Sequence, residues 1–231
     1  MGPSKFVDSC EKAGIIIPED LYCEECGKGS AQHKKENHPF DCDEDETAMT
    51  GVKVVRAYRT KYALVVQMWA EQEACAIAAV VSRAPVQCGP VTWRYEAPFL
   101  YCELPSGRRL AYNEPRVKST IMPWGKAKDV LSYMGVNPLT RQWQRQPCYG
   151  GMLVENIVQA ISRDLMAHGM LQAERGGVYR LVLSVHDELV AEAPEGAGSV
   201  EGFEACMADV PDWGHGCPVE AEGWTGTRYR K

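Results

Sequence analysis

Near the C-terminal end of the chain, two apolar runs flank three consecutive ionisable residues. The runs 181–185 and 189–191 are rich in β-branched and aliphatic side chains, which predicts two short strands and a hairpin over residues 180–192. Two-residue hairpin turns usually hold Gly, Asn or Asp-Gly, because such turns need positive φ angles. Here the turn is expected at His186-Asp187, followed by Glu188, with no Gly or Asn. This corner therefore has chemistry that a simple turn does not require.

The segment before the hairpin has the spacing of an amphipathic helix. The pattern predicts a helix over residues 149–169, and another from a cap at Ser199 through Met207, ended by Pro211 and Gly214. The apolar stripe of the first helix is formed by Val154, Ile157, Val158, Ile161 and Leu165. The residues expected elsewhere on its surface are Glu155, Gln159, Ser162 and Arg163.

The first part of the chain is helical in pattern, and the middle part is strand-like. Apolar positions three and four apart predict helix over 52–81, whereas 86–134 alternates aromatic and β-branched runs with turn residues. Residues 21–50 are polar and nearly free of aliphatic side chains, so we interpret them as an inserted loop. The sequence thus predicts an α+β protein with a helical region over 1–85 and an antiparallel sheet with packed helices over 86–231.

The composition is that of a globular protein. Of 231 residues, 45% are apolar and 24% are charged, and the net charge of −6 gives no bulk signal of nucleic-acid binding, although a local basic groove can lie on an acidic protein. A membrane span requires about 18 consecutive apolar residues, and neither such a run nor a secretory signal is evident. We expect a cytoplasmic protein with reduced thiols and no membrane partner.

The inserted loop has the ligand spacing of a structural zinc site. Cys23 and Cys26 are followed by His38 and Cys42, with His33 as an alternate ligand. Because a polar loop cannot fold by burial, a bound Zn²⁺ would supply its folding energy; the alternative is a disordered loop. The remaining cysteines lack ligand spacing and are expected to be core or surface thiols: Cys10, Cys75, Cys88, Cys102, Cys148, Cys206 and Cys217.

The paired carboxylates at the hairpin turn suggest a metal site. Mg²⁺ prefers oxygen ligands and is usually held by one or two carboxylates together with substrate phosphates. Asp187 and Glu188 would offer such ligands from a rigid corner. The alternative is a solvated, charged turn.

Several segments together resemble the C-terminal palm of family A (DNA polymerase I-like) DNA polymerases. The main ones are ENIVQAISRDLM at 155–166 and SVHDELVAEAPEG at 184–196. CGPVTWRYE, FLYCELPSGRRLAY and the terminal EGWTGTRYRK are similar to the bacteriophage members, and the first residues resemble the segment that follows the family's second motif. The resemblance implies that 86–231 is a palm subdomain and that 1–85 is the end of a helical fingers region.

The resemblance also implies residue roles and ligands. Asp187 would bind the catalytic Mg²⁺ ions, Glu188 would support the metal site, and His186 would hold the primer terminus. Gln159 would contact the minor-groove edge of the terminal base pair. Arg141, Arg145 and Arg163 are further candidates for phosphate contacts, with a solvated helix face as their alternative. The substrates would be primer-template DNA and deoxynucleoside triphosphates.

Two motifs of that family are not found in this sequence. The first supplies a second metal-bridging aspartate and the second supplies the lysine that binds the triphosphate, so one carboxylate turn is not sufficient for a two-metal site. We therefore expect no polymerisation by this chain alone. Either an N-terminal polymerase polypeptide supplies the missing motifs, or the chain is an inactive relic that acts at most as a DNA-binding module. A zinc-dependent nuclease in the inserted loop is a further, weaker alternative.

Overall fold

The computed structural model describes residues 12–13, 50–121 and 127–229. The chain divides into two compact units, Met1–Met68 and Trp69–Lys231, and each is described by itself. The predicted zinc ligands Cys23, Cys26, His33, His38 and Cys42 lie outside the described residues, as does Cys10. The zinc site therefore stays a prediction.

The described part of the first unit is helical, as the spacing predicts. Helix α3 spans Thr50–Lys61, and helix α4 spans Ala63–Ser82 and continues into the second unit. The single stretch predicted over 52–81 is therefore interrupted at Tyr62. The Tyr62 amide donates a regular α-helical hydrogen bond to the Tyr58 carbonyl, four residues back (2.8 Å). The Val65 amide then donates to the Tyr62 carbonyl, only three residues back (3.0 Å). This 3-10 spacing marks the end of one helix and the beginning of the next.

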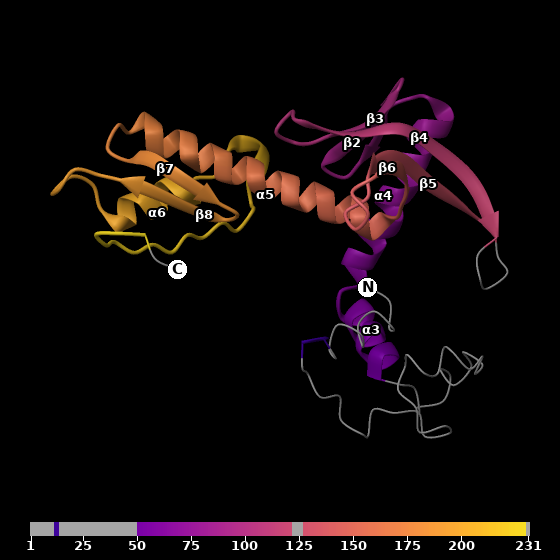
Figure 1. Ribbon diagram of the computed structural model, residues 1–231, viewed down its shortest axis with the longest axis horizontal. Coiled ribbons are helices and arrows are strands. Elements are labelled where there is room, and N and C mark those ends of the chain that lie inside the picture. Colours follow the sequence, from indigo (N-terminus) through magenta and orange to yellow (C-terminus); the bar gives the residue numbers. More distant parts are fainter. Residues whose placement is uncertain (1–11, 14–49, 122–126, 230–231) are drawn as a thin grey trace. The chain divides into compact units, whose positions relative to one another are not determined.

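The second unit contains a six-stranded antiparallel sheet in which each strand pairs with the next along the chain (Figure 1). Sequence pattern predicted strands only as far as residue 134, but the sheet continues to Cys148, because the polar strand β6 pairs with β5. Its strands are β1 (Val86–Cys88), β2 (Val91–Glu96), β3 (Phe99–Glu103), β4 (Arg109–Ile121), β5 (Ala127–Val136) and β6 (Trp143–Cys148).

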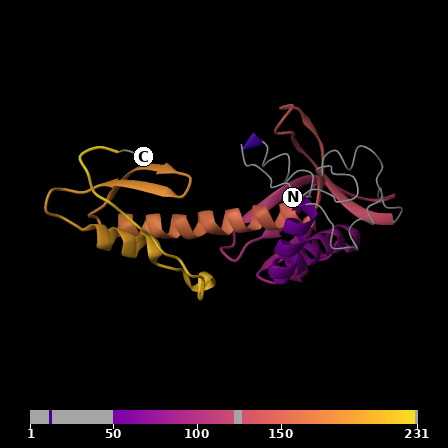
Figure 2. The same cartoon turned by 90° about the horizontal axis from the view of Figure 1, so that it is seen from below.

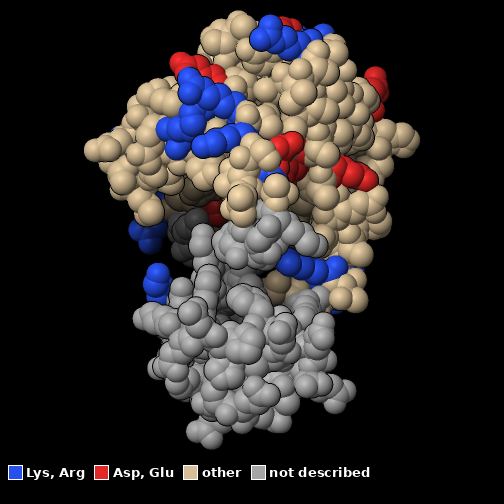
Figure 3. Space-filling view, turned by 90° about the vertical axis from the view of Figure 1, so that its right-hand side faces the viewer, with Lys and Arg blue, Asp and Glu red and all other residues tan. Residues whose placement is uncertain are grey.

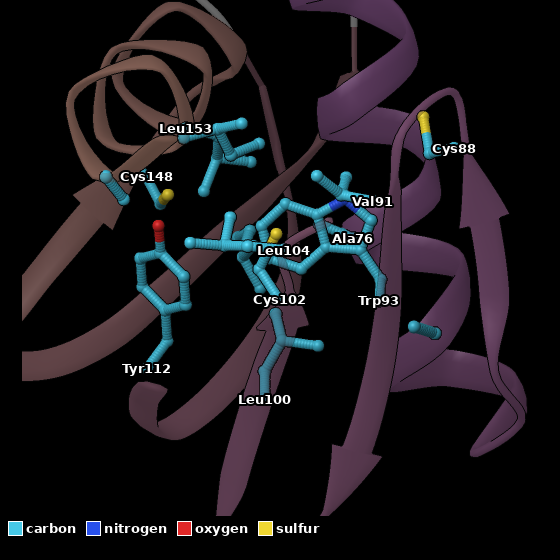
Figure 4. Close-up of a cluster of buried hydrophobic side chains, with 14 residues drawn as sticks. Ala76, Cys88, Val91, Trp93, Leu100, Cys102, Leu104, Tyr112, Cys148 and Leu153 are labelled. Atoms are coloured by element: carbon cyan, nitrogen blue, oxygen red, sulfur yellow. The ribbon is translucent and has the colours of Figure 1, made fainter. Parts of the chain in front are cut away.

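Helix α4 packs against this sheet around a buried tryptophan (Figure 4). The fully buried Trp93 donates its indole N–H to Gln72 Oε1 (2.8 Å), and Gln72 Nε2 donates to the Cys88 carbonyl (3.2 Å). The buried amide is thus satisfied on both sides, which a buried polar group requires. Among the described residues, α4 alone has the length and apolar composition of a membrane-spanning helix. Its buried positions nevertheless include this hydrogen-bonded glutamine.

Helix α5 (Gly150–Arg175) joins the sheet to the C-terminal elements (Figure 2). It is longer than the predicted helix, which ended at residue 169. Leu153, Ile157 and Ala160 in its first half belong to the core of the sheet, whereas Val158 of the predicted stripe is 51% exposed. The buried face is therefore rotated from the predicted one, since small Ala160 lies in the helix–sheet contact.

The close approach of α4 and α5 depends on a glycine. A Cβ on Gly150 would lie 1.9 Å from the Trp69 carbonyl oxygen, so no larger residue fits without movement of the backbone. Glu73 of α4 accepts a hydrogen bond from the Gly150 amide (3.3 Å) and pairs with Lys128 of β5 (2.7 Å). A carboxylate at the first turn of a helix also interacts favourably with the helix dipole.

The C-terminal elements lie along the second half of α5. Strands β7 (Arg180–Val185) and β8 (Glu188–Glu192) form the hairpin that the sequence predicted. The sequence predicted a single antiparallel sheet over 86–231, whereas the hairpin within this range forms a separate two-stranded sheet. Helix α6 (Val200–Ala208) is capped by Ser199, whose hydroxyl accepts from the Gly202 amide as predicted, and the 3-10 turn η3 (Asp212–Gly214) follows.

Candidate functional site

The hairpin turn has only two residues, His186 and Asp187. Val185 pairs with Glu188, so these two residues alone connect the strands. His186 has φ = 52°, whereas Asp187 is not among the residues of positive φ. Both side chains are exposed, and Glu188 is partly buried at the start of β8. The turn thus presents an imidazole and a carboxylate to solvent on a rigid β-hairpin.

The backbone of His186 is in the left-handed region, where glycine is usual. An L-residue there costs about 1–2 kcal/mol, although His is tolerated better than most residues. Such strain persists where the surrounding structure imposes it, and it is concentrated at functional sites. A two-residue turn requires a positive φ, and Arg83, Glu114 and Arg141 also have one. The angle at His186 is therefore compatible with a functional role for this turn but does not by itself assign one.

Tyr229 contacts the second carboxylate of the site. Its hydroxyl donates a hydrogen bond to Glu188 Oε2 (2.7 Å). This bond to the carboxylate is the main cause of a raised Tyr229 pKa, because the bond favours the protonated phenol. Sequence reasoning noted the terminal EGWTGTRYRK but assigned no role to Tyr229, since its contact with residue 188 is long-range. The C-terminal segment thus fixes the orientation of Glu188.

The exposed face of α5 carries the predicted polar residues toward the hairpin. Glu155, Gln159 and Arg163 are each four residues apart and exposed, so they form one stripe along the helix. Gln159 donates to Glu155 (3.4 Å), and Arg163 Nη1 donates to Ser184 Oγ of β7 (3.1 Å). Gln159 and Arg163 therefore share a helix face that reaches the hairpin.

The other two predicted arginines lie on the six-stranded sheet. Arg145 of β6 donates to the Glu114 carbonyl (2.9 Å) and lies 3.6 Å from the Glu114 carboxylate. Arg141 is in the turn between β5 and β6, with φ = 58°. The structure describes no contact of either residue with the β7–β8 hairpin. Their predicted phosphate contacts remain a prediction.

A polar contact that sequence reasoning missed holds the middle of α5. Asp164 accepts from Ser106 Oγ (2.5 Å) and from Arg108 Nε (2.6 Å), and Arg108 Nη2 also donates to the Ala160 carbonyl (2.8 Å). Ser106 and Arg108 lie in the β3–β4 turn, within the quoted LPSGRR stretch. This contact fixes the helix turn that carries Gln159 and Arg163.

The hairpin alone offers too few ligands for a metal site. Asp187 and Glu188 provide the oxygen ligands that Mg²⁺ prefers, yet no group of three His, Cys, Asp or Glu side chains close enough to hold a metal occurs among the described residues. Asp187 and Glu188 therefore fit Mg²⁺ in the type of their ligand atoms, but they are too few to hold it alone.

The cysteines of the second unit behave as the core or surface thiols that were predicted. Cys88, Cys102 and Cys148 are buried, and Cys217 is exposed. Burial raises the pKa of the Cys102 and Cys148 thiols to about 12, so they stay protonated and are poor metal ligands.

Comparison with known proteins identifies one relative in sequence. Over 180 residues, the chain is 38% identical to the DNA polymerase of Bacillus phage SP02. The match covers 78% of this chain but 27% of that polymerase, so the chain spans about a quarter of the relative's length. No protein-family model matches the chain, and no solved structure matches it. Most of the chain is thus similar in sequence to part of a bacteriophage DNA polymerase.

Proposed function

We propose that this chain contributes part of the active site of a DNA-directed DNA polymerase of bacteriophage type and family A. The observation that carries the proposal is the strained, exposed His186-Asp187 turn, in a chain with 38% identity to a phage polymerase. The substrates would be primer-template DNA and deoxynucleoside triphosphates. In this proposal, residues 86–231 are the palm subdomain and residues 1–85 the end of the fingers.

Each polar residue of the site has a role in this proposal. When Mg²⁺ is bound, it stabilises the charge that develops during nucleotidyl transfer. Asp187 would hold this ion, and Glu188, oriented by Tyr229, would support the metal site. His186 would donate a hydrogen bond to the primer terminus. Gln159 and Arg163, on the helix face that reaches β7, would contact the terminal base pair and the backbone phosphates.

The remaining parts of a two-metal site must come from residues beyond those described here. Two bridging carboxylates usually hold metal ions that are about 3.5–4 Å apart, and the hairpin offers one turn of carboxylates. The missing groups would be supplied by another segment of a longer polypeptide or by a partner polypeptide. A catalytically inactive DNA-binding module is the second candidate, favoured by the incomplete ligand group among the described residues.

Zinc belongs to the proposal as a separate structural ion. Cys23, Cys26, His38 and Cys42 have the spacing for it. Elemental analysis of the purified chain tests this directly, with one Zn²⁺ per chain expected and its absence contradicting the zinc site.

The metal role of the hairpin is tested by binding of a fluorescent primer-template with and without Mg²⁺. We expect Mg²⁺ to increase the affinity of the wild-type chain, and Asp187→Asn to remove this increase. The matched control is Asp212→Asn, which neutralises an exposed aspartate of η3 and should keep the Mg²⁺ effect. An equal Mg²⁺ effect in wild type and Asp187→Asn would contradict the metal role.

A further inference from the structure

The long strands β4 and β5 continue beyond the sheet as a two-stranded ribbon (Figure 1). Pairing of β3 with β4 ends at Asn113, and pairing of β5 with β6 begins at Leu131. Residues 116–121 and 127–130 therefore pair only with each other in the described part of the chain. We call these two segments the ribbon.

The ribbon is exposed on both faces. Apart from the partly buried Val117 and Val130, all its residues are exposed, and Ile121 at its end is 77% exposed. A two-stranded ribbon is only marginally stable in water without a packing partner. Packing within this unit therefore does not explain why β4 and β5 extend beyond the sheet.

The ribbon and the adjoining strands are basic on an acidic protein. Residues 115–121 and 127–148 contain five Lys or Arg and one Asp, whereas the whole chain has a net charge of −6. Figure 3 views the side of the molecule toward which β4 and β5 project, where several groups of Lys and Arg side chains lie together with Asp and Glu side chains. The basic residues are Arg116, Lys118, Lys128, Arg141 and Arg145.

The two cations of β4 are the most available of these. Arg116 and Lys118 are two residues apart on one strand, so they point to the same face, about 6.7 Å apart. Both are exposed, Arg116 lies 3.8 Å from the Glu114 carboxylate, and no ion pair of Lys118 occurs among the described residues. Lys128, opposite Thr120, is instead paired with Glu73. The ribbon thus presents Lys118 with no ion pair among the described residues, and Arg116 in an exposed pair with Glu114. An exposed pair of this kind is weak and leaves Arg116 free to contact a phosphate.

We propose that the ribbon binds duplex DNA, with Arg116 and Lys118 contacting the phosphate backbone. The major groove of B-DNA admits a two-stranded β-ribbon, and lysine and arginine contacts to phosphate supply binding that does not depend on sequence. The spacing of about 6.7 Å is twice the rise of about 3.4 Å per nucleotide along one DNA strand. The choice of DNA as the nucleic acid rests on the proposed function, whereas the existence of the ribbon and its basic charge are observed independently of that function.

The experiment measures binding of the 231-residue chain to a fluorescent duplex whose two ends are closed by loops, so that it offers no primer end, between about 50 and 200 mM salt. We compare wild type with the double variant Arg116→Gln, Lys118→Gln. Affinity falls as the salt concentration rises, so the plot of log affinity against log salt has a negative slope. The loss of two phosphate contacts should make this slope less steep by about 1–2 and weaken binding several-fold at each salt concentration. Circular dichroism and thermal unfolding verify that the variant is folded.

Two controls separate the ribbon from bulk charge. The double variant Arg175→Gln, Arg180→Gln removes two exposed arginines from the end of α5 and the start of β7 and should leave the slope unchanged. The exchange Arg116→Lys, Lys118→Arg keeps the ribbon's charge and should bind as wild type does. A single-stranded oligonucleotide of equal length should bind more weakly than the duplex.

Three results would overturn the proposal. These are an unchanged slope in the Gln variant, an equal loss in the Arg175, Arg180 control, or tighter binding of the single strand. In the first case the lysine and arginine would serve only to prevent edge-to-edge pairing of the exposed strands. None of these results bears on Asp187, because the duplex has no primer end and the hairpin variants are measured separately.

Discussion

At the scale of single residues, the turn of the β7–β8 hairpin combines strain with exposed ionisable groups. The sequence predicted a two-residue corner at His186-Asp187, and the pairing of Val185 with Glu188 agrees with it. It did not predict which residue has the positive φ, because both turn residues lack the glycine that would indicate it. The hydrogen bond from Tyr229 to Glu188 could likewise not be predicted, because the two residues are far apart in the sequence.

The strain at His186 gives a prediction that separates stability from activity. Because glycine has no cost at φ = 52°, His186→Gly should leave the free energy of unfolding unchanged or raise it by up to about 1 kcal/mol. When the chain is assayed together with the product of the upstream reading frame, the same variant should extend primers more slowly than wild type, since the imidazole is lost. Thermal unfolding and primer extension measure the two effects.

The control for His186→Gly is His215→Gly, at a histidine with φ = −51°. There glycine relieves no strain, so no gain in stability is expected. A lower free energy of unfolding for His186→Gly than for wild type would contradict the argument from strain.

Tyr229 is a positioning residue, because it acts through Glu188. Tyr229→Phe removes the hydrogen bond of 2.7 Å and leaves the ring, so the Glu188 carboxylate should become less ordered. The Mg²⁺ concentration for half-maximal primer extension, measured together with the product of the upstream reading frame, should then rise about 2–10-fold. The effect is modest because Tyr229 is exposed and Glu188 is only partly buried. Tyr149→Phe, at another exposed tyrosine, is the matched control. The same Mg²⁺ dependence in Tyr229→Phe and wild type would remove this role.

At the scale of elements, α5 is the part on which the arrangement of the site depends. Its first half lies in the core of the sheet, its middle is fixed by Asp164, and its second half packs against α6 and β7. The periodicity of apolar residues predicted this helix and its polar stripe. The rotated buried face and the extra turns beyond residue 169 were not predicted, because they depend on which neighbours α5 meets.

Gly150 allows α4 and α5 to meet at their closest point. Gly150→Ala places a methyl group against the Trp69 carbonyl, so the two helices must separate. We expect a loss of about 1–3 kcal/mol in the free energy of unfolding, as for other overpacked cores. Chemical denaturation measures it, with Gly176→Ala as the control, since a Cβ there meets its nearest atom only at 3.5 Å. Since alanine favours a helix more than glycine does, helix propensity gives no loss in either variant, and equal losses in both would contradict the role of the close approach.

The contact between α5 and α6 should depend on pH. Asp209 accepts hydrogen bonds from His168 and Gln172, each at 2.7 Å, and the bond to His168 is the main cause of a lowered Asp209 pKa. A carboxyl whose pKa is lower in the folded state contributes stability above its ordinary pKa of about 4 and loses it as the pH falls.

Asp209→Asn tests this dependence. The variant should melt at a lower temperature than wild type near neutral pH, and the difference should disappear as the pH falls below about 4. Thermal unfolding over a pH series measures the difference. A difference that is constant across this range would show that the charge of Asp209 does not matter.

The strands of the sheet show where sequence pattern fails at this scale. Strand β6 has the polar sequence WQRQPC, and only its register with β5 makes it a strand. The separation of the hairpin from the six-stranded sheet could also not be predicted from the sequence. The alternation of apolar and polar side chains indicates which face of a strand is buried, but not which strands pair.

At the scale of the whole molecule, the proposed function makes this chain one part of a larger catalytic arrangement. The Asp187-Glu188 pair and the stripe of Gln159 and Arg163 lie on one hairpin and one helix, but the described residues do not complete a metal site. The match to about a quarter of a phage polymerase agrees with this partial character. We therefore propose that Asp187 belongs to a polymerase active site which further protein segments complete.

Primer extension tests this claim most directly. The chain is assayed with Mg²⁺ and the four deoxynucleoside triphosphates, alone, together with the product of the upstream reading frame, and joined to that product as one polypeptide. We predict extension only when the additional segment is present, and a decrease of about 100-fold or more with Asp187→Asn, since several kcal/mol of transition-state stabilisation would be lost. Wild-type rates with Asp187→Asn, or no extension in any combination of folded proteins, would contradict the account.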